Sequence, residues 1–130
     1  MVEKLKKILI IDDERSIRAT LKEILEFEKY LVETAQDGIE GYKMAEEKNF
    51  DLIFCDIKMP KIDGIETLKK IVENNILSPV IMISGHGDIE TAVQTLKIGA
   101  FDYIEKPLDL NRVLTCVRNA LDNSHLKKEK

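Results

Sequence analysis

The sequence has few of the features that mark several protein classes. Its two cysteines, Cys55 and Cys116, form no Cys-x-x-Cys pair, so a cysteine metal or redox motif is not expected. We interpret them as buried free thiols in a reducing compartment. No apolar run approaches the roughly 20 residues that span a bilayer. The run behind basic residues 1–7, Ile8–Ile11, is too short for a signal-peptide core. We therefore expect a cytoplasmic protein without a membrane segment.

Glycine and proline are also sparse, and no linker-like, repeated or low-complexity segment interrupts the 130 residues. A chain of this length fits one domain. Its hydrophobic content of 44% is sufficient for a core. The 24 acidic and 20 basic residues give a net charge of −4, which argues against direct nucleic-acid binding.

Short apolar runs alternate along the chain with segments of helical spacing. The runs are mostly β-branched and lack polar alternation, as expected of parallel strands covered on both faces. They are Ile8–Ile11, Leu31–Ala35, Leu52–Cys55, Val80–Ile83 and Phe101–Ile104. The intervening segments show apolar residues at helical spacing, as in Ile17, Leu21, Ile24 and Leu25. Five strand–helix repeats predict an open parallel sheet with helices on both faces.

Acidic residues mark several expected helix starts. Asp88 and Asp109 stand just before two helical stripes, where a side-chain oxygen is expected to cap the first free N–H groups. Asp37-Gly38 predicts a turn before a weaker helix over Ile39–Glu47.

Polar residues follow four of the apolar runs. Asp12 and Asp13 follow the first run, Asp56 the third, Ser84 the fourth, and Lys106 lies just beyond the fifth. Ligands of open α/β sheets bind beyond the carboxyl ends of the strands. We therefore expect three carboxylates, one hydroxyl and one ammonium to meet at one edge of the sheet.

This combination suits phosphoryl transfer to a carboxylate. Clustered carboxylates repel one another, and Mg²⁺, which prefers oxygen ligands, relieves that repulsion. A carboxylate can attack phosphorus to give an aspartyl phosphate. Lys106 and Ser84 would then supply a positive charge and a hydrogen-bond donor to the new oxygens. Taken singly, each residue is explained as well by a turn, a helix cap or a solvated side chain. The joint placement of all five favours a functional site.

The ordered motifs resemble those of response-regulator receiver domains of two-component systems, over about residues 5–121. The motifs are Ile10-Ile11-Asp12-Asp13-Glu14, Asp56-Ile57-Lys58-Met59-Pro60 with Asp63-Gly64, Ile83-Ser84-Gly85, and Lys106-Pro107. The resemblance implies a flavodoxin-like, doubly wound α/β fold, with five parallel strands in the order 2-1-3-4-5 and five helices. This strand order is an expectation taken from the family, because hydrophobic periodicity does not specify it.

The resemblance also implies roles for the acidic residues. Asp56 is expected to accept the phosphoryl group from a sensor histidine kinase. Asp13 is expected to bind Mg²⁺ directly, and Asp12 largely through water. Asp56 and the backbone carbonyl of Lys58 are expected to complete the protein ligands of the metal.

The remaining family positions concern the conformational change that follows phosphorylation, which we call the switch. Ser84 is expected to be the switch hydroxyl, Lys106 the phosphate-pairing lysine, and Tyr103 the aromatic residue whose orientation follows activation. The Lys106–Pro107 peptide bond is expected to be cis, although an arbitrary X-Pro bond is cis in only about 5–6% of cases. The signalling surface is expected on the fourth helix, fifth strand and fifth helix, which could also form a homodimer.

Lys58 and His86 occupy family positions that tune the lifetime of the phosphoryl group. Ser84 departs from the threonine of many relatives but keeps the hydroxyl.

A finer resemblance, over 84–93 and 99–107, is to receivers of sigma-54-dependent, NtrC-like enhancer-binding activators. Those proteins carry an AAA+ ATPase and a DNA-binding domain after the receiver. We expect residues 1–124 to form the receiver and 125–130 to begin a linker or tail. The chain is then either a fragment, which we favour, or a stand-alone receiver. Neither alternative makes it an enzyme with an external substrate.

Three other functions fit the sequence less well. A resemblance to aspartyl phosphohydrolases would require an Asp-x-Asp motif after the first strand. Here Asp12 and Asp13 are adjacent, and the expected nucleophile lies at the third run. A flavin-binding module needs a phosphate loop rich in Ser, Thr or Gly after the first strand. That loop instead carries Asp12, Asp13 and Glu14, which would repel phosphate. A degenerate receiver acting only through protein contacts would not need the complete set of site residues.

Overall fold

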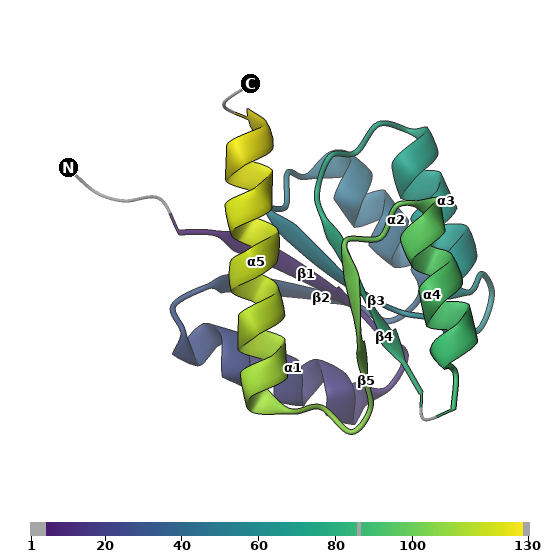
Figure 1. Ribbon diagram of the computed structural model, residues 1–130, viewed down its shortest axis with the longest axis horizontal. Coiled ribbons are helices and arrows are strands. Elements are labelled where there is room, and N and C mark those ends of the chain that lie inside the picture. The colour runs from purple at the N-terminus through teal and green to yellow at the C-terminus, as the bar shows by residue number, and fades with distance from the viewer. Residues whose placement is uncertain (1–4, 86, 129–130) are drawn as a thin grey trace.

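The computed structural model describes residues 5–85 and 87–128 of the chain (Figure 1). Within these residues, five strands form one parallel sheet in the order β2-β1-β3-β4-β5. The strands are β1 (Lys7–Ile11), β2 (Leu31–Ala35), β3 (Leu52–Asp56), β4 (Val80–Ser84) and β5 (Asp102–Glu105). The expected fold class and strand order are therefore confirmed.

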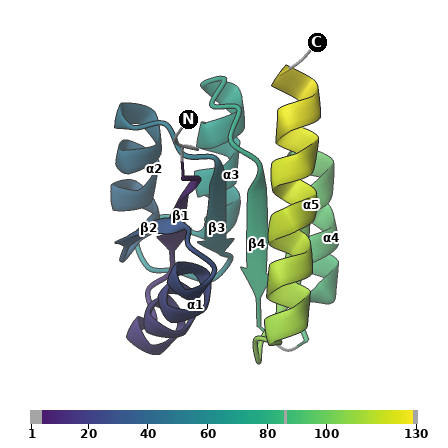
Figure 2. The same cartoon turned by 90° about the vertical axis from the view of Figure 1, so that its left-hand side faces the viewer.

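Five helices connect or follow these strands in the described part of the chain. They are α1 (Arg15–Phe27), α2 (Gly38–Glu47), α3 (Gly64–Glu73), α4 (Ile89–Ile98) and α5 (Leu110–Lys128). Figure 2 shows α1 and α5 on one face of the sheet and α2, α3 and α4 on the other. Both faces of the sheet are thus covered, which explains why the strands are apolar without alternation.

Successive residues of each strand contribute to two separate cores. In β1, Ile8 and Ile10 pack with the α1 and α5 side, whereas Leu9 and Ile11 pack with the α2, α3 and α4 side. All four side chains are fully buried. At roughly 1.5–3 kcal/mol for each large apolar side chain removed from water, this double burial holds the strand ends in place.

The structure corrects the predicted ends of three strands. β3 continues through Asp56 and β4 through Ser84, so these two polar residues are the last residues of buried strands. β5 covers Asp102–Glu105, one residue later than the predicted run. The parallel ladder itself supplies the reason, because backbone pairing at a strand end does not require an apolar side chain.

The helix starts follow the sequence with one exception. Asp37 caps α2, and the carboxylate of Asp109 accepts a hydrogen bond from the backbone N–H of Arg112. The predicted cap by Asp88 is wrong, since its side chain makes no capping hydrogen bond to α4. That carboxylate pairs instead with Lys58, at 3.3 Å between Oδ2 and Nζ.

The last helix continues beyond the domain boundary expected from the sequence. The backbone of α5 is helical through Lys128, so residues 125–128 extend this helix. The boundary between 124 and 125 stays a prediction. Across 5–85 and 87–128, no helix combines the length and apolar character that a membrane span requires.

Candidate functional site

The carboxyl ends of β1 and β3 bring three aspartates together. Asp12 and Asp13 follow β1 directly, and Asp56 is the last residue of β3. The strands are neighbours, with Ile11 paired to Cys55. One carboxylate oxygen from each aspartate lies within 4.8 Å of the other two. We call these three residues the acid pocket.

Two of the three residues of the acid pocket are buried. Asp12 is fully buried and Asp56 is 3% exposed, whereas Asp13 is exposed. Burial raises the pKa of the Asp56 carboxyl to about 7, and the neighbouring charge of Asp12 adds to that rise. Burial also raises the pKa of Asp12, against the opposing effects of a hydrogen bond from the Glu14 N–H and the charge of Lys106.

One oxygen of Asp12 lacks the partner that a buried polar atom normally has. Oδ1 accepts a hydrogen bond of 2.8 Å from the backbone N–H of Glu14. Oδ2 is the one buried side-chain oxygen or nitrogen in the described residues without a hydrogen-bond partner. Leaving such a group unpaired is costly. A hard cation, coordinated directly or through water, fits this unpaired oxygen and the three-carboxylate set.

Lys106 lies beside the acid pocket in the loop after β5. Its Nζ is 3.7 Å from Oδ1 of Asp56 and 3.9 Å from Oδ2 of Asp12. Its shortest contact, 2.6 Å, is with Oε1 of Glu14. Burial opposes the charge of Lys106, but the bond to Glu14 and the charges of Asp12 and Asp56 outweigh it and raise the pKa. The Lys106–Pro107 peptide bond is cis.

Ser84 and Tyr103 lie on the adjoining strands β4 and β5. Ser84 is fully buried, and its hydroxyl donates a 3.4 Å hydrogen bond to the carbonyl of Ile104. Its backbone carbonyl accepts a 2.8 Å bond from the N–H of Lys106. Tyr103 is half-buried and packs against the core beneath α2, α3 and α4. The two expected switch residues are therefore linked through β5 to the lysine of the site.

Lys58 lies in the loop after β3, two residues beyond Asp56. Its side chain is 77% exposed and reaches Asp88 at the start of α4. The structure brings Asp12, Asp13, Asp56 and Lys106 together, and the role of the Lys58 carbonyl stays a prediction. His86, the other expected lifetime position, lies outside the described residues.

Gly64 lets the start of α3 approach the end of β3. A Cβ atom at this position would overlap the backbone carbonyl of Asp56. The N–H of Gly64 donates a 2.7 Å hydrogen bond to the carbonyl of Ile57. A residue without a side chain is therefore required for this packing.

Two acidic residues of the site were not identified from the sequence. Glu14 binds Lys106, and Asp88 binds Lys58. Glu14 directly follows the acidic pair, but its 92-residue separation from Lys106 gives no local pattern that predicts the contact. Asp88 was expected to cap a helix because the local sequence gives no information about its distant partner Lys58.

The fold and the carboxylate–lysine pocket at the carboxyl ends of the strands define the receiver class of signalling proteins. The family model described as "Response regulator receiver domain" matches residues 8–118. The chain belongs to this family, and it is a receiver domain of two-component response regulators.

Several proteins of similar sequence are regulators of transcription. The transcriptional regulatory protein ZraR of Klebsiella oxytoca is 39% identical over 121 residues, covering 93% of this chain and 27% of ZraR. The nitrogen assimilation regulatory protein NtrX of Azorhizobium caulinodans is 41% identical over 124 residues, covering 94% of this chain and 27% of NtrX. The expected resemblance to NtrC-like receivers is confirmed. The chain spans about a quarter of the length of these relatives.

Solved structures agree with this assignment. NtrX from Brucella abortus has a TM-score of 0.91 and 38% identity, over 97% of this chain and 29% of that one. A CheY-like receiver domain protein from Methanospirillum hungatei has a TM-score of 0.89 and 37% identity, over 95% and 99% of the two chains.

Proposed function

We propose that Asp56 accepts a phosphoryl group from a sensor histidine kinase, with Mg²⁺ bound by Asp12, Asp13, Asp56 and the carbonyl of Lys58. The observation on which this rests is the buried Asp12 oxygen without a partner, facing two further carboxylates and a lysine. Mg²⁺, when bound, supplies the positive charge that offsets the three carboxylates and the transferred oxygens.

Asp56, Lys106 and Ser84 have different roles in the proposed phosphoryl transfer. An oxygen of the Asp56 carboxylate forms a bond to phosphorus, while the bond from phosphorus to the kinase histidine breaks and its electron pair stays on that nitrogen. The carboxylate must be ionised to attack. Lys106, 3.7 Å from Asp56, is placed to pair with the new phosphoryl oxygens. Once the Ser84 hydroxyl leaves the carbonyl of Ile104, it donates a hydrogen bond to a phosphoryl oxygen.

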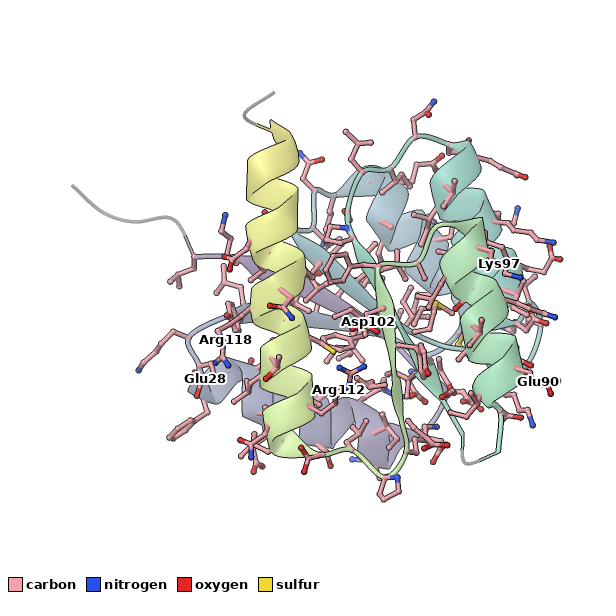
Figure 3. All side chains as sticks on the ribbon, viewed as in Figure 1. Glu28, Glu90, Lys97, Asp102, Arg112 and Arg118 are labelled. Atoms are coloured by element: carbon pink, nitrogen blue, oxygen red, sulfur yellow. The ribbon has the colours of Figure 1, made fainter. Side chains whose placement is uncertain are left out.

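The switch is proposed to involve α4, β5 and α5. Movement of the Ser84 hydroxyl toward the phosphoryl group frees space into which the Tyr103 ring turns, and α4 shifts with it. Figure 3 shows Arg112 of α5 reaching toward Asp102 of β5, which supports a mechanical link between these two elements. Arg112 Nη2 lies 2.9 Å from the carbonyl oxygen of Tyr103 and 3.3 Å from Asp102. Shifting such an element from mostly off to mostly on requires about 5 kcal/mol of differential stabilisation.

The output is proposed to be regulation of transcription through an AAA+ ATPase and a DNA-binding region following the receiver. Residues 1–124 would form the receiver and 125–130 the start of the connection. The α4-β5-α5 surface would contact that region or a second receiver. In this proposal the chain acts in the cytoplasm, does not bind DNA itself, and promotes only its own phosphorylation and dephosphorylation. Lys58 and His86 would set the lifetime of the phosphoryl group.

Intact mass after incubation with acetyl phosphate tests the acceptor. We expect one phosphate adduct in the presence of Mg²⁺, no adduct in Asp56→Asn, and none in chelator. An adduct that persists in Asp56→Asn, or that forms fully without metal, would refute the assignment.

Amide chemical shifts test the switch surface. Between the free and beryllofluoride-bound states, we expect changes at the site loops, along 88–97 and along 101–104. Changes confined to the site loops, α1 and α2 would contradict the proposed surface.

A further inference from the structure

We propose that the ion pair between Lys58 and Asp88 is a latch that holds the start of α4 in its unphosphorylated position. This inference rests on the proposed function and deepens it, because it names a contact that opposes the switch. Lys58 lies two residues after the acceptor Asp56, and Asp88 immediately precedes α4. The pair, with 3.3 Å between Nζ and Oδ2, therefore joins the acceptor loop directly to the helix expected to move.

The other aspartates at helix starts show what Asp88 does not do. Asp37 and Asp63 precede α2 and α3 with extended backbones, at ψ 172° and 177°. Their carboxylates accept hydrogen bonds from the N–H groups of Glu40 and Glu66. Asp88 has φ −102° and ψ 29° and makes no such bond. The first N–H groups of α4 thus lack the side-chain acceptor that the same residue type provides elsewhere in this molecule.

Pairing with a lysine does not by itself prevent capping. Asp37 caps α2 through Oδ1 and pairs with Lys61 through Oδ2, at 3.2 Å. The difference at Asp88 is the position of its partner. Asp88 Oδ2 lies on the side of Gly85, where a Cβ atom would be 3.1 Å from it, and pairs with Lys58. The ion pair therefore holds Asp88 in a backbone conformation from which it does not cap α4.

The strength of the pair suits a contact that is meant to be released. The Lys58 side chain is 77% exposed and that of Asp88 is 22% exposed. Exposed ion pairs of this kind shift an equilibrium by about two- to five-fold. Phosphorylation replaces the single negative charge of the Asp56 carboxylate with a phosphoryl group of about −1.5 to −2. The added negative charge and the new oxygens, two residues from Lys58, compete with Asp88 for the ammonium. Asp88, once released, turns to cap α4 and the start of the helix moves.

Amide hydrogen exchange and chemical shifts of the unphosphorylated protein test the latch. In Lys58→Gln and in Asp88→Asn, which keeps a side chain able to cap, we expect the N–H groups of Glu90 and Thr91 to exchange about two- to five-fold more slowly. The resonances of α4 should also move toward their beryllofluoride-bound positions. The double variant should show no more than either single change, because both break one contact.

Lys61→Gln is the matched control. It removes the same charge from the same loop and breaks an ion pair of nearly equal length to another helix-start aspartate, so α4 should be unaffected. The latch is overturned if neither Lys58→Gln nor Asp88→Asn changes α4, if Lys61→Gln has the same effect, or if the two changes add in the double variant. Failure of Asp56 to take phosphate in the mass assay would refute the proposed function instead, since these measurements use the unphosphorylated protein.

Discussion

Replacing Asp56 with asparagine is expected to stabilise the metal-free protein at alkaline pH and to leave it unchanged near pH 4. Burial and the charge of Asp12 raise the pKa of Asp56 from 3.8 to about 7. A carboxyl whose pKa is raised by folding stabilises the folded state while it is protonated. That contribution is complete below about pH 4 and is lost as the pH rises through about 7. Asparagine mimics the neutral carboxyl at every pH.

The size of the effect follows from the shift in pKa. A rise from 3.8 to about 7 corresponds to about 4 kcal/mol, at 1.36 kcal/mol for each pH unit. Asp12 shares the titration, because its own pKa is raised in the same pocket. We therefore expect Asp56→Asn to be more stable than the wild type by about 2–4 kcal/mol at pH 8. For a domain of this size the melting temperature would rise by about 10 °C.

Urea denaturation in chelator, between about pH 4 and pH 8, measures this difference. Glu73→Gln, which removes one exposed carboxylate from α3, controls for net charge and should show no such pH dependence. Mg²⁺ at about 100 times its Kd should stabilise the wild type by about 2.7 kcal/mol and the asparagine variant much less. A stability difference that stays constant across this pH range, or equal stabilisation of both proteins by Mg²⁺, would refute the electrostatic account of the site.

Three further outcomes are expected. Asp13→Ala should weaken Mg²⁺ binding in a calorimetric titration far more than Glu14→Ala, because Glu14 is engaged by Lys106; equal losses would contradict a direct role for Asp13. Gly64→Ala should lower the free energy of unfolding by about 2 kcal/mol in urea, because the added Cβ would overlap the backbone at the end of β3; an unchanged value would contradict that packing. Burial raises the pKa of both thiols, to about 11 at Cys116. Cys55 and Cys116 should therefore react with a thiol reagent at pH 8 only after unfolding, and rapid labelling of the folded protein would contradict their burial.

Much of the fold was predictable because it depends on local patterns. The apolar runs at 8–11 and 80–83 identified buried parallel strands, since both faces of this sheet are covered. The meeting of Asp12 and Asp56 was predictable for a general reason, because parallel strands end at one edge of a sheet. The strand order could not be obtained from periodicity and came from the resemblance to receivers. The shift of one residue at β5 reflects backbone pairing, which side-chain hydropathy does not report.

The contacts that sequence reasoning missed all join distant parts of the chain. Asp88 looked like a cap because aspartate before a helical stripe usually is one. Its carboxylate pairs instead with Lys58, which the tertiary fold brings near from the loop after β3. The contact of Glu14 with Lys106 was equally hidden, since it requires the ends of β1 and β5 to be placed in space.

The Glu14–Lys106 and Lys58–Asp88 ion pairs differ in the effect that their release has on the helix that follows the acidic residue. Glu14 precedes α1 with an extended backbone, at ψ 117°, and makes no capping hydrogen bond. Glutamate is not among the residues that favour this capping position, so its release from Lys106 leaves the start of α1 without a new acceptor. Asp88 is a favoured capping residue held in a backbone conformation unsuited to capping. In the proposed switch, a phosphoryl group that draws both lysines is therefore expected to change the conformation of α4 and to leave α1 in place, which directs the response toward α4.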